Sequence, residues 1–344
     1  MSITVPVDVH DAFSHLFLVG LASIVEEEMP GTYCALRWEG SGTSATVMFS
    51  SPMELDDVTA CVHSHVAKYN DLLAMTSDGE YDGGTPHATM SPRLSNIVEP
   101  SGWRALQHDR QNAIDALDSM GECRYFGALG QPSYWSGRVS GSSHALQADY
   151  GASRWEMVAR NRGQEFISGR LRKLAQIASD FSSERIWAGI SGEVETDECG
   201  KNKSDSRTAT GLHAPSLTDN VRAWCALIGV SAFPVIPSVS DSRDSTAAMF
   251  QISRKGSYAV LPVFTGEWTL SRFRSVARSA ALLQAGASVV LAEGDSEFTV
   301  HDDWLAERNV IACAIFRQFV SDNKSAPERW LERGTFTPVR GTSR

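Results

Sequence analysis

The chain of 344 residues is 42% hydrophobic and 21% charged, a composition typical of a globular protein and not of a disordered or fibrous one. No apolar run approaches the roughly 20 residues of a membrane span, and the N-terminal segment lacks the basic start of a secretory signal. Six scattered cysteines form no CxxC pair, so we expect reduced thiols in a cytosolic protein without membrane contact.

The net charge of −10 is distributed unevenly along the chain. Residues 1–100 contain 3 Lys and Arg against 14 Asp and Glu, whereas residues 101–344 contain 28 against 27. The acidity therefore belongs to the N-terminal region, and the remainder is neutral with local basic clusters. Such asymmetry permits a nucleic-acid contact in one part of the chain and a protein contact in another.

The first 150 residues alternate between strand and helix patterns. We expect Asp11 to cap a helix that carries an apolar stripe from Phe13 to Val25. The other expected elements are a strand from Ile3 to Val9, a hairpin of Thr32–Trp38 with Ala45–Phe49, helices over Met53–Ala74 and Trp103–Met120, and an ordered aromatic loop over Cys123–His144.

The central region is predicted to hold one buried helix against a small sheet. Ser216, with Asp219 as its capping-box partner, begins this helix, and Gly229 ends it in a left-handed conformation. Around it we expect a long helix over Trp155–Phe181, an exposed polar loop over Glu193–Thr210, a strand over Ser231–Pro237, and a strand pair of Met249–Ile252 with Tyr258–Phe264.

The C-terminal region is predicted to be mainly helical. A helix over Leu270–Ala285 would present Arg272, Arg274 and Arg278 on its outer face. A short strand at Ser288–Ala292 and a strongly amphipathic helix over Asp302–Val320 follow. Together these patterns predict an α+β fold with mixed small sheets, packed helices and a helical C-terminal region. We expect three regions: 1–150, 151–265 and 266–344.

No motif indicates catalysis or a cofactor. The sequence lacks a GxxxxGK[ST] phosphate loop, a strand–GxGxxG–helix unit and a nucleophile elbow. His63 and His65 lie two residues apart on a predicted helix, where their side chains diverge by about 200° and cannot share a metal. His301–Asp302 lacks the further ligands of a metal site, and Asp302 is better explained as a helix cap. We therefore expect no enzyme activity, no metal and no cofactor.

Basic side chains are the remaining candidates for function. They lie on one face of the predicted helix at 155–181 and in the adjoining polar loop. Long cationic side chains on a helix beside a polar loop suit contact with a phosphate backbone. The candidate DNA-binding residues are Arg154, Arg162, Arg172, Lys173, Lys201, Asn202, Lys203 and Arg207.

Several stretches resemble a known family. The V-P-V-D-V start, the F-L-V-G-L-A helix at Phe17–Ala22 and the Phe126–Gly130 stretch ahead of Trp135 are similar to subunits of type I-G CRISPR Cascade surveillance complexes. So are the S-R-T-x-x-G loop at Ser206–Gly211, the G-V-S-A-F-P-V-I-P stretch and the strand that ends in L-P-V-F-T. The layout matches over most of the chain.

The resemblance implies the large subunit of such a complex, which is not catalytic. That subunit would read the protospacer-adjacent motif (PAM) on target double-stranded DNA, help to open the duplex, and recruit the helicase–nuclease in antiviral defence. Its other partners would be the guide RNA (crRNA) and the remaining Cascade subunits. Two alternatives stay open: a backbone subunit that binds the crRNA, and an unrelated cytosolic enzyme whose site is assembled from scattered residues.

Overall fold

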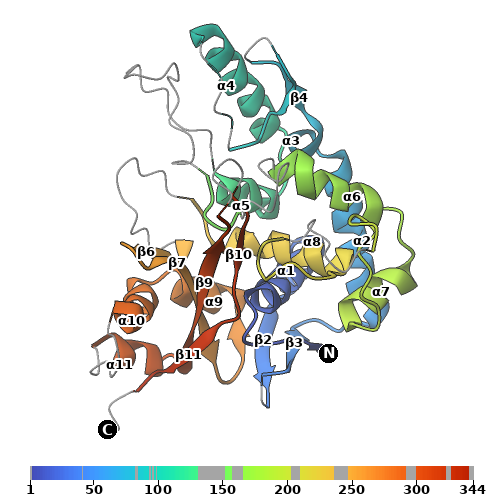
Figure 1. The fold of residues 1–344 in the computed structure, drawn as a ribbon. Coiled ribbons are helices and arrows are strands. Elements are labelled where there is room, and N and C mark those ends of the chain that lie inside the picture. Colours follow the sequence, from blue (N-terminus) through green and yellow to red (C-terminus); the bar gives the residue numbers. More distant parts are fainter. Residues whose placement is uncertain are drawn as a thin grey trace.

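The computed structural model describes residues 2–40, 42–81, 84–92, 94, 97, 99–130, 152–156, 166–202, 210–235, 247–291, 300–322 and 327–340. Its architecture is mixed α+β, as the sequence predicts, with helices packed on small antiparallel sheets (Figure 1). The main hydrophobic core draws side chains from all three predicted regions, and the region boundaries near 150 and 265 stay predictions.

The first sheet joins the N-terminal strands to a segment far along the chain. Its strand order is β1 (Ser2–Pro6), β3 (Ser44–Phe49), β2 (Cys34–Glu39) and β8 (Trp268–Thr269). The hairpin of β2 and β3 confirms the prediction, and β1 matches the first predicted strand. Strand β8 pairs with β2 through Ala35↔Thr269 and Leu36↔Trp268 and thereby completes the sheet.

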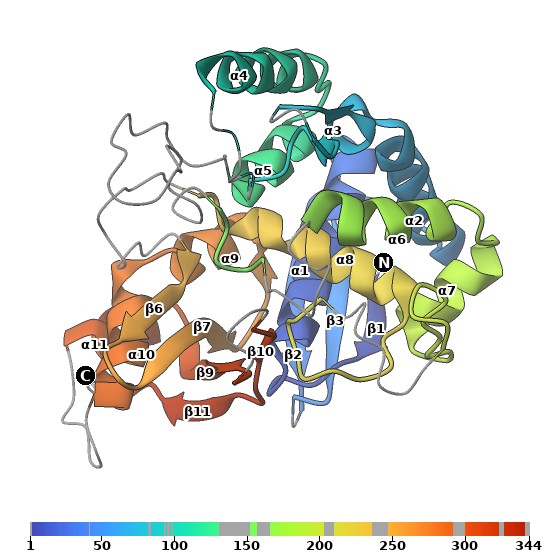
Figure 2. The same ribbon diagram turned by 45° about the horizontal axis from the view of Figure 1, so that its top comes forward.

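Two buried helices, α1 (Ala12–Glu28) and α8 (Asn220–Gly229), pack against one another at the centre of the fold (Figure 2). Asp11 caps α1 as predicted and accepts a hydrogen bond from the Phe13 amide. The cap of α8 is Asp219, which accepts from the amides of Val221 and Arg222. The predicted cap was wrong, because the Ser216 hydroxyl instead lies 3.1 Å from Nδ1 of His213.

Glycines permit the close approach of α1 and α8. A Cβ added to Gly20 would come within 3.0 Å of the Cys225 carbonyl, and one added to Gly229 would come within 3.0 Å of the Leu16 carbonyl. The predicted left-handed cap at Gly229 was wrong, since its φ is −57° and the chain continues into the 3-10 turn η2 (Val230–Ala232). A strand was expected at Ser231–Pro237, but its first residues belong to this turn. Residues 236 and 237 lie outside the described part of the chain.

A group of helices covers the side of the molecule remote from the second sheet. Helix α2 (Leu55–Asp71) contacts α1, α6 (Arg172–Ala178) and α7 (Ser183–Ser191). A π-helical turn, η1 (Ile167–Leu171), leads into α6. The long helix predicted from Trp155 does not begin there, because Arg154 and Trp155 lie in a turn; residues 157–165 lie outside the described part.

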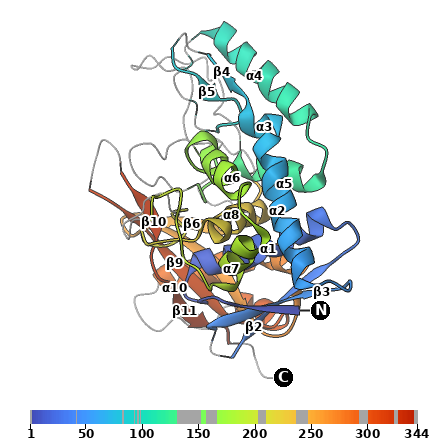
Figure 3. The same ribbon diagram turned by 90° about the vertical axis from the view of Figure 1, so that its right-hand side faces the viewer.

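A small peripheral unit stands at one end of the molecule (Figure 3). It contains α3 (Leu73–Thr76), the β4–β5 pair (Asp78–Gly79 and His87–Ala88) and α4 (Pro100–Asp115). Its own hydrophobic cluster is formed by Tyr81, Leu94, Ile97 and Leu106.

Helix α5 (Met120–Leu129) returns the chain from this unit to the core. It starts with a capping box of Ser119 and Glu122. The prediction of a loop from Cys123 was therefore wrong for the residues up to Leu129, because they are helical. The rest of the expected loop, from 131 to 144, lies outside the described residues.

The second sheet has the strand order β10 (Arg329–Leu331), β9 (Val310–Val320), β7 (Gly256–Phe264) and β6 (Met249–Ile252), with β11 (Thr335–Pro338) also paired to β9. The β6–β7 pair confirms the prediction. The helix predicted over Asp302–Val320 was wrong, because only α11 (Val300–Ala306) is helical and β9 is a central strand. Asn309, with a φ of 62°, separates the two elements.

The C-terminal region therefore mixes strands with helices α9 (Leu270–Ala277), α10 (Ala280–Leu291) and α11. The helix predicted at Leu270–Ala285 is divided near Arg278–Ser279, where the Ser279 hydroxyl accepts from the Leu282 amide. The prediction of a strand at Ser288–Ala292 was wrong for the residues up to Leu291, because they belong to α10. Helix α10 packs on β6, β7 and β9.

The Gly20→Ala variant tests the helix contact. Its methyl group must displace the Cys225 carbonyl, a backbone group that cannot rotate away, so we expect the free energy of unfolding to fall by about 3 kcal/mol. Gly127→Ala is the matched control, because a Cβ there meets nothing within 4 Å and alanine favours helix. We expect the control to be neutral or up to about 1 kcal/mol more stable. Equal urea midpoints for the two variants would contradict the close contact.

Candidate nucleic-acid interface

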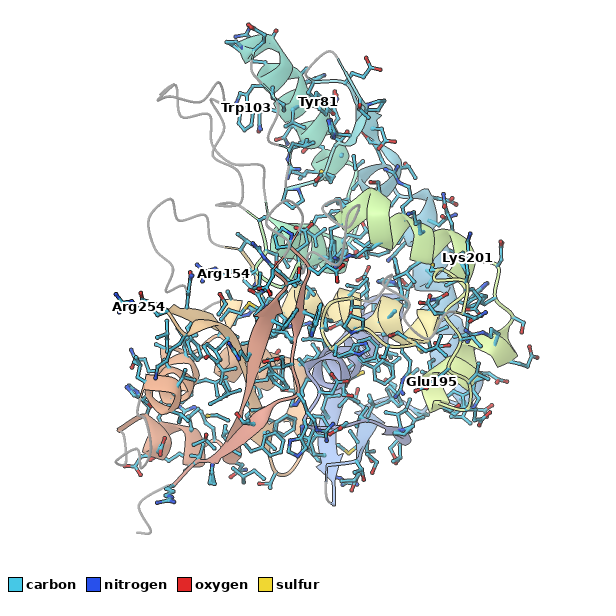
Figure 4. All side chains as sticks on the ribbon, in the orientation of Figure 1. Tyr81, Trp103, Arg154, Glu195, Lys201 and Arg254 are labelled. Carbon is cyan, nitrogen blue, oxygen red and sulfur yellow. The ribbon has the colours of Figure 1, made fainter. Side chains whose placement is uncertain are left out.

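The structure separates the candidate DNA-binding residues. Arg154 and Lys201 lie on opposite sides of the molecule in Figure 4. Arg154 precedes Trp155, which is buried and donates from Nε1 to the Ala247 carbonyl at 2.7 Å. The sequence predicted one cationic helix face made of Arg154, Arg162, Arg172 and Lys173. That prediction was wrong for Arg154, because Arg154 lies in a turn that is not part of the helix. Arg162, Lys203 and Arg207 lie outside the described residues.

Arg172 is occupied by protein contacts. Its guanidinium donates to both carboxylate oxygens of Asp78, at 3.0 and 2.9 Å, and Nε donates to the Met75 carbonyl at 2.8 Å. A bidentate pair of this kind has the geometry that arginine and carboxylate favour. Arg172 therefore ties α6 to the peripheral unit, and a DNA contact by this side chain would replace these bonds.

Lys173 and Lys201 are both exposed. The charge of Lys173 reaches the thiol of Cys199, two residues before Lys201. Burial and the nearby Asp197 and Glu198 carboxylates raise the pKa of that thiol to about 12, and Lys173 opposes the shift. Asn202 is also exposed, and these three side chains are here called the Lys173–Asn202 surface.

The loop that carries Lys201 and Asn202 is anchored to the start of α8. The Asp197 carboxylate accepts from the Gly200 amide at 2.7 Å and from the Asn220 side chain at 2.9 Å. The Asp197 carbonyl accepts from the Asn202 amide, also at 2.7 Å. Lys201 and Asn202 have φ values of 60° and 53°, so this tight turn holds both residues in the left-handed region. The turn therefore projects two polar side chains from a fixed base.

Carboxylates beside this loop have internal partners. Arg185 donates to Glu198 at 2.9 Å and pairs with Asp219 at 2.7 Å, where Asp219 is the cap of α8. Burial raises the pKa of Asp219, and the neighbouring Arg185 and the amides of Arg222 and Val221 oppose that rise. These pairs leave Lys173 and Lys201 as the outward cations of the surface, although Glu195 lies on the same side of the molecule (Figure 4).

A second cationic cluster escaped the sequence analysis. Arg124 of α5 and Arg274 of α9 line a pocket of about 270 Å³ between α1, α5, α8 and α9. Arg278 follows Arg274 by one helical turn, and the three charges influence one another. The prediction that Arg274 lies on the outer face of its helix was wrong, because it is half-buried, lines the pocket and donates to Ser23 of α1. Burial and the charge of Arg124 lower its pKa to about 10, and Glu26 opposes this shift. The i,i+4 spacing of Arg274 and Arg278 was the available sequence signal.

A buried charge network lies under the same pocket. Lys68 bonds to Glu27 at 2.6 Å and to Glu28 at 2.9 Å, and its ammonium lies 3.5 Å from Glu122. Trp224 donates from Nε1 to Nδ1 of His65 at 3.1 Å. Because indole nitrogen can only donate, the His65 proton belongs on Nε2, which lies 3.7 Å from Glu27. Burial would raise the pKa of Glu27, but His65 and Lys68 outweigh it and lower the value to about 2.

Metal-binding clusters and membrane-spanning helices were also sought in the part of the chain that the structure describes. No group of three or more His, Cys, Asp and Glu side chains there is placed to hold a metal ion. Among the same residues, no helix combines the length and apolar character needed to cross a membrane. Comparison with known proteins found no family model that matches the chain and no curated protein with a significant match.

The pKa of Glu27 predicts an acid-sensitive contribution to stability. Its value is about 2 in the folded chain and 4.5 as an unperturbed carboxyl, so the unfolded state binds the proton first. The stabilisation is complete above pH 4.5 and is lost as the pH falls towards 2. We expect Glu27→Gln to lower the free energy of unfolding by about 3 kcal/mol at pH 7. The difference from the unmodified protein should shrink below pH 4.5 in urea titrations, and a constant difference from pH 7 to pH 3 would contradict the network.

Proposed function

We propose that this chain is a noncatalytic nucleic-acid-binding subunit of an RNA-guided CRISPR Cascade complex. In this role it contacts target double-stranded DNA at the PAM, assists duplex opening and helps to recruit the helicase–nuclease in the cytoplasm. Guide pairing supplies the sequence specificity, and the protein contributes PAM and backbone contacts. The chain acts without a catalytic residue, metal or cofactor of its own.

The observation that carries the proposal is the combined pattern of the family-like stretches. They run from the V-P-V-D-V start to the L-P-V-F-T strand and match that family in layout over most of the chain. These stretches include parts of α1, α5, α8 and β7, which are elements of the main hydrophobic core. The resemblance therefore includes residues of the buried core.

The Lys173–Asn202 surface supports a phosphate contact within this role. Lys173 and Lys201 are exposed, and the turn beneath Lys201 is held by Asp197 and Asn220. A cation on a fixed turn loses less conformational entropy on binding than one on an unanchored chain. Lysine contacts of this kind add affinity for the phosphate backbone without selecting a base.

Co-purification tests the proposal directly. We expect the tagged chain, expressed with its native neighbouring genes, to recover a guide RNA of about 60 nucleotides and several protein subunits, as RNA-guided assembly requires. Binding of the purified complex to PAM-bearing DNA should fall when this chain is omitted. Equal DNA binding without the chain, or elution of the chain alone and free of nucleic acid, would refute the proposal. Crosslinks along the guide RNA in place of the PAM duplex would favour a crRNA-binding backbone subunit.

Charge reversal tests the predicted DNA contacts of the polar loop. We expect Lys201→Glu, Lys203→Glu and Arg207→Glu together to weaken DNA binding by the complex. Each lost phosphate contact should also reduce the salt dependence by roughly 1 unit of slope. Lys173→Glu should add to the effect, since Lys173 shares the same surface.

Arg254→Glu is the matched control for these charge reversals. Arg254 is exposed and lies on the opposite side of the molecule from Lys201 (Figure 4). We expect its reversal to leave affinity and salt slope unchanged. A triple variant with the affinity and slope of this control would assign the loop to surface that does not contact DNA.

A further inference from the structure

The pocket between α1, α5, α8 and α9 has arginine side chains without ion-pair partners along one side. Arg124 of α5 and Arg274 of α9 line it, Arg278 lies one helical turn beyond Arg274, and none of the three forms an ion pair with another described residue. Glu26 is the carboxylate whose charge acts on Arg274. One oxygen of Glu26 already accepts from the Cys34 amide at 3.0 Å.

Arg274 is only partly satisfied by the protein. Its Nη2 donates to the Ser23 hydroxyl at 3.1 Å, and its Nε is buried without a hydrogen-bond partner among the described residues. Arg278 uses Nε for the Ala232 carbonyl at 2.5 Å. Like charges one helical turn apart repel, and a buried guanidinium nitrogen without a partner costs free energy. A bound anion would accept hydrogen bonds from these guanidinium groups and reduce the repulsion between them.

We propose that this pocket binds a phosphate monoester or inorganic phosphate as a dianion. Two guanidinium groups line the pocket, a third lies one helical turn away, and none of the three has an ion-pair partner among the described residues, so this side of the pocket suits the charge of about −1.5 to −2 on such a group near neutral pH. A phosphodiester carries only one negative charge. Guanidinium N–H groups present the paired donors that phosphate oxygens accept, and the hydroxyls of Ser23 and Ser231 line the same pocket.

Glu27 faces Lys68 rather than the arginines. It also lines the pocket, but its carboxylate bonds to Lys68 and to the Ser119 hydroxyl and lies close to Gly121 at the start of α5. The anion would therefore sit on the arginine side, away from the start of α5. This inference does not depend on the proposed function, because it concerns a different surface from Lys173–Asn202.

Thermal unfolding with inorganic phosphate, against potassium chloride of matched ionic strength, tests the site in the full chain. We expect phosphate to raise the unfolding midpoint, since a ligand of the folded state stabilises it. Arg274→Gln should abolish that rise and, without phosphate, should unfold at the same or a higher temperature, because it removes an unsatisfied charge. A lower midpoint without phosphate would show that Arg274 acts through structure alone, and no rise in the unmodified protein would overturn the proposal.

A second variant avoids the buried position. Arg124 is exposed, and Arg124→Gln should weaken phosphate affinity by about 10-fold or more while the fold is retained. Arg104→Gln on α4 is the control, because Arg104 is exposed, lies in the peripheral unit and does not line the pocket. Equal affinities for the two variants would refute the site.

Oligonucleotides then distinguish the source of the phosphate. A tetranucleotide with a 5′-phosphate is compared with the same tetranucleotide ending in a 5′-hydroxyl and with free phosphate. Tighter binding of the phosphorylated tetranucleotide than of free phosphate, lost in Arg124→Gln, would identify a nucleic-acid end. Equal binding of free phosphate would identify a small phosphate ligand. Equal binding of the two tetranucleotides would show that a diester backbone suffices and would overturn the dianion proposal.

Discussion

The contact between α1 and α8 is the constraint on which the rest of the fold depends. Gly20 and Gly229 let each helix approach the backbone of the other, which brings Cys225 against Gly20 and Leu16 against Gly229. The two helices are buried along nearly their full length, so they form the interior rather than a covering layer. The first sheet packs against α1, while α2, α6 and α7 pack around the pair.

The same helix pair connects the core to the charged groups. Trp224 on α8 donates to His65 on α2, and this bond selects the tautomer whose proton faces Glu27 on α1. Glu27 and Glu28 in turn hold Lys68 within one network. On the other side of Glu27, Arg124, Arg274 and Arg278 form no ion pair with another described residue. Whether a charge is paired matters most where it is buried, because an unpaired charge costs far more free energy in the protein interior than in water.

The two cationic sites differ in the way the backbone presents them. Lys173 and Lys201 are exposed and reach into solvent from a helix and from an anchored turn. Arg124 and Arg274, with Arg278 one turn further along α9, meet at a pocket from helices that are distant in sequence. Exposed lysines suit a long polyanion that passes over a surface, whereas converging arginines suit a compact anion with several oxygens. The molecule thus presents cationic side chains in two different ways on separate elements.

The sequence by itself determined the α+β class, the cap of α1, the β2–β3 hairpin and the β6–β7 pair, because these depend on local periodicity, turns and caps. Only the tertiary structure decided that Val310–Val320 is a strand. Ile311, Ile315 and Phe319 also recur at helical spacing, and the strand is selected by pairing with β7, β10 and β11. Likewise, charge spacing identified exposed basic residues but could not show that Asp78 occupies Arg172, or that α5 and α9 bring Arg124 to Arg274. Those contacts join residues about 90 and 150 positions apart, and only packing of the whole chain brings them together.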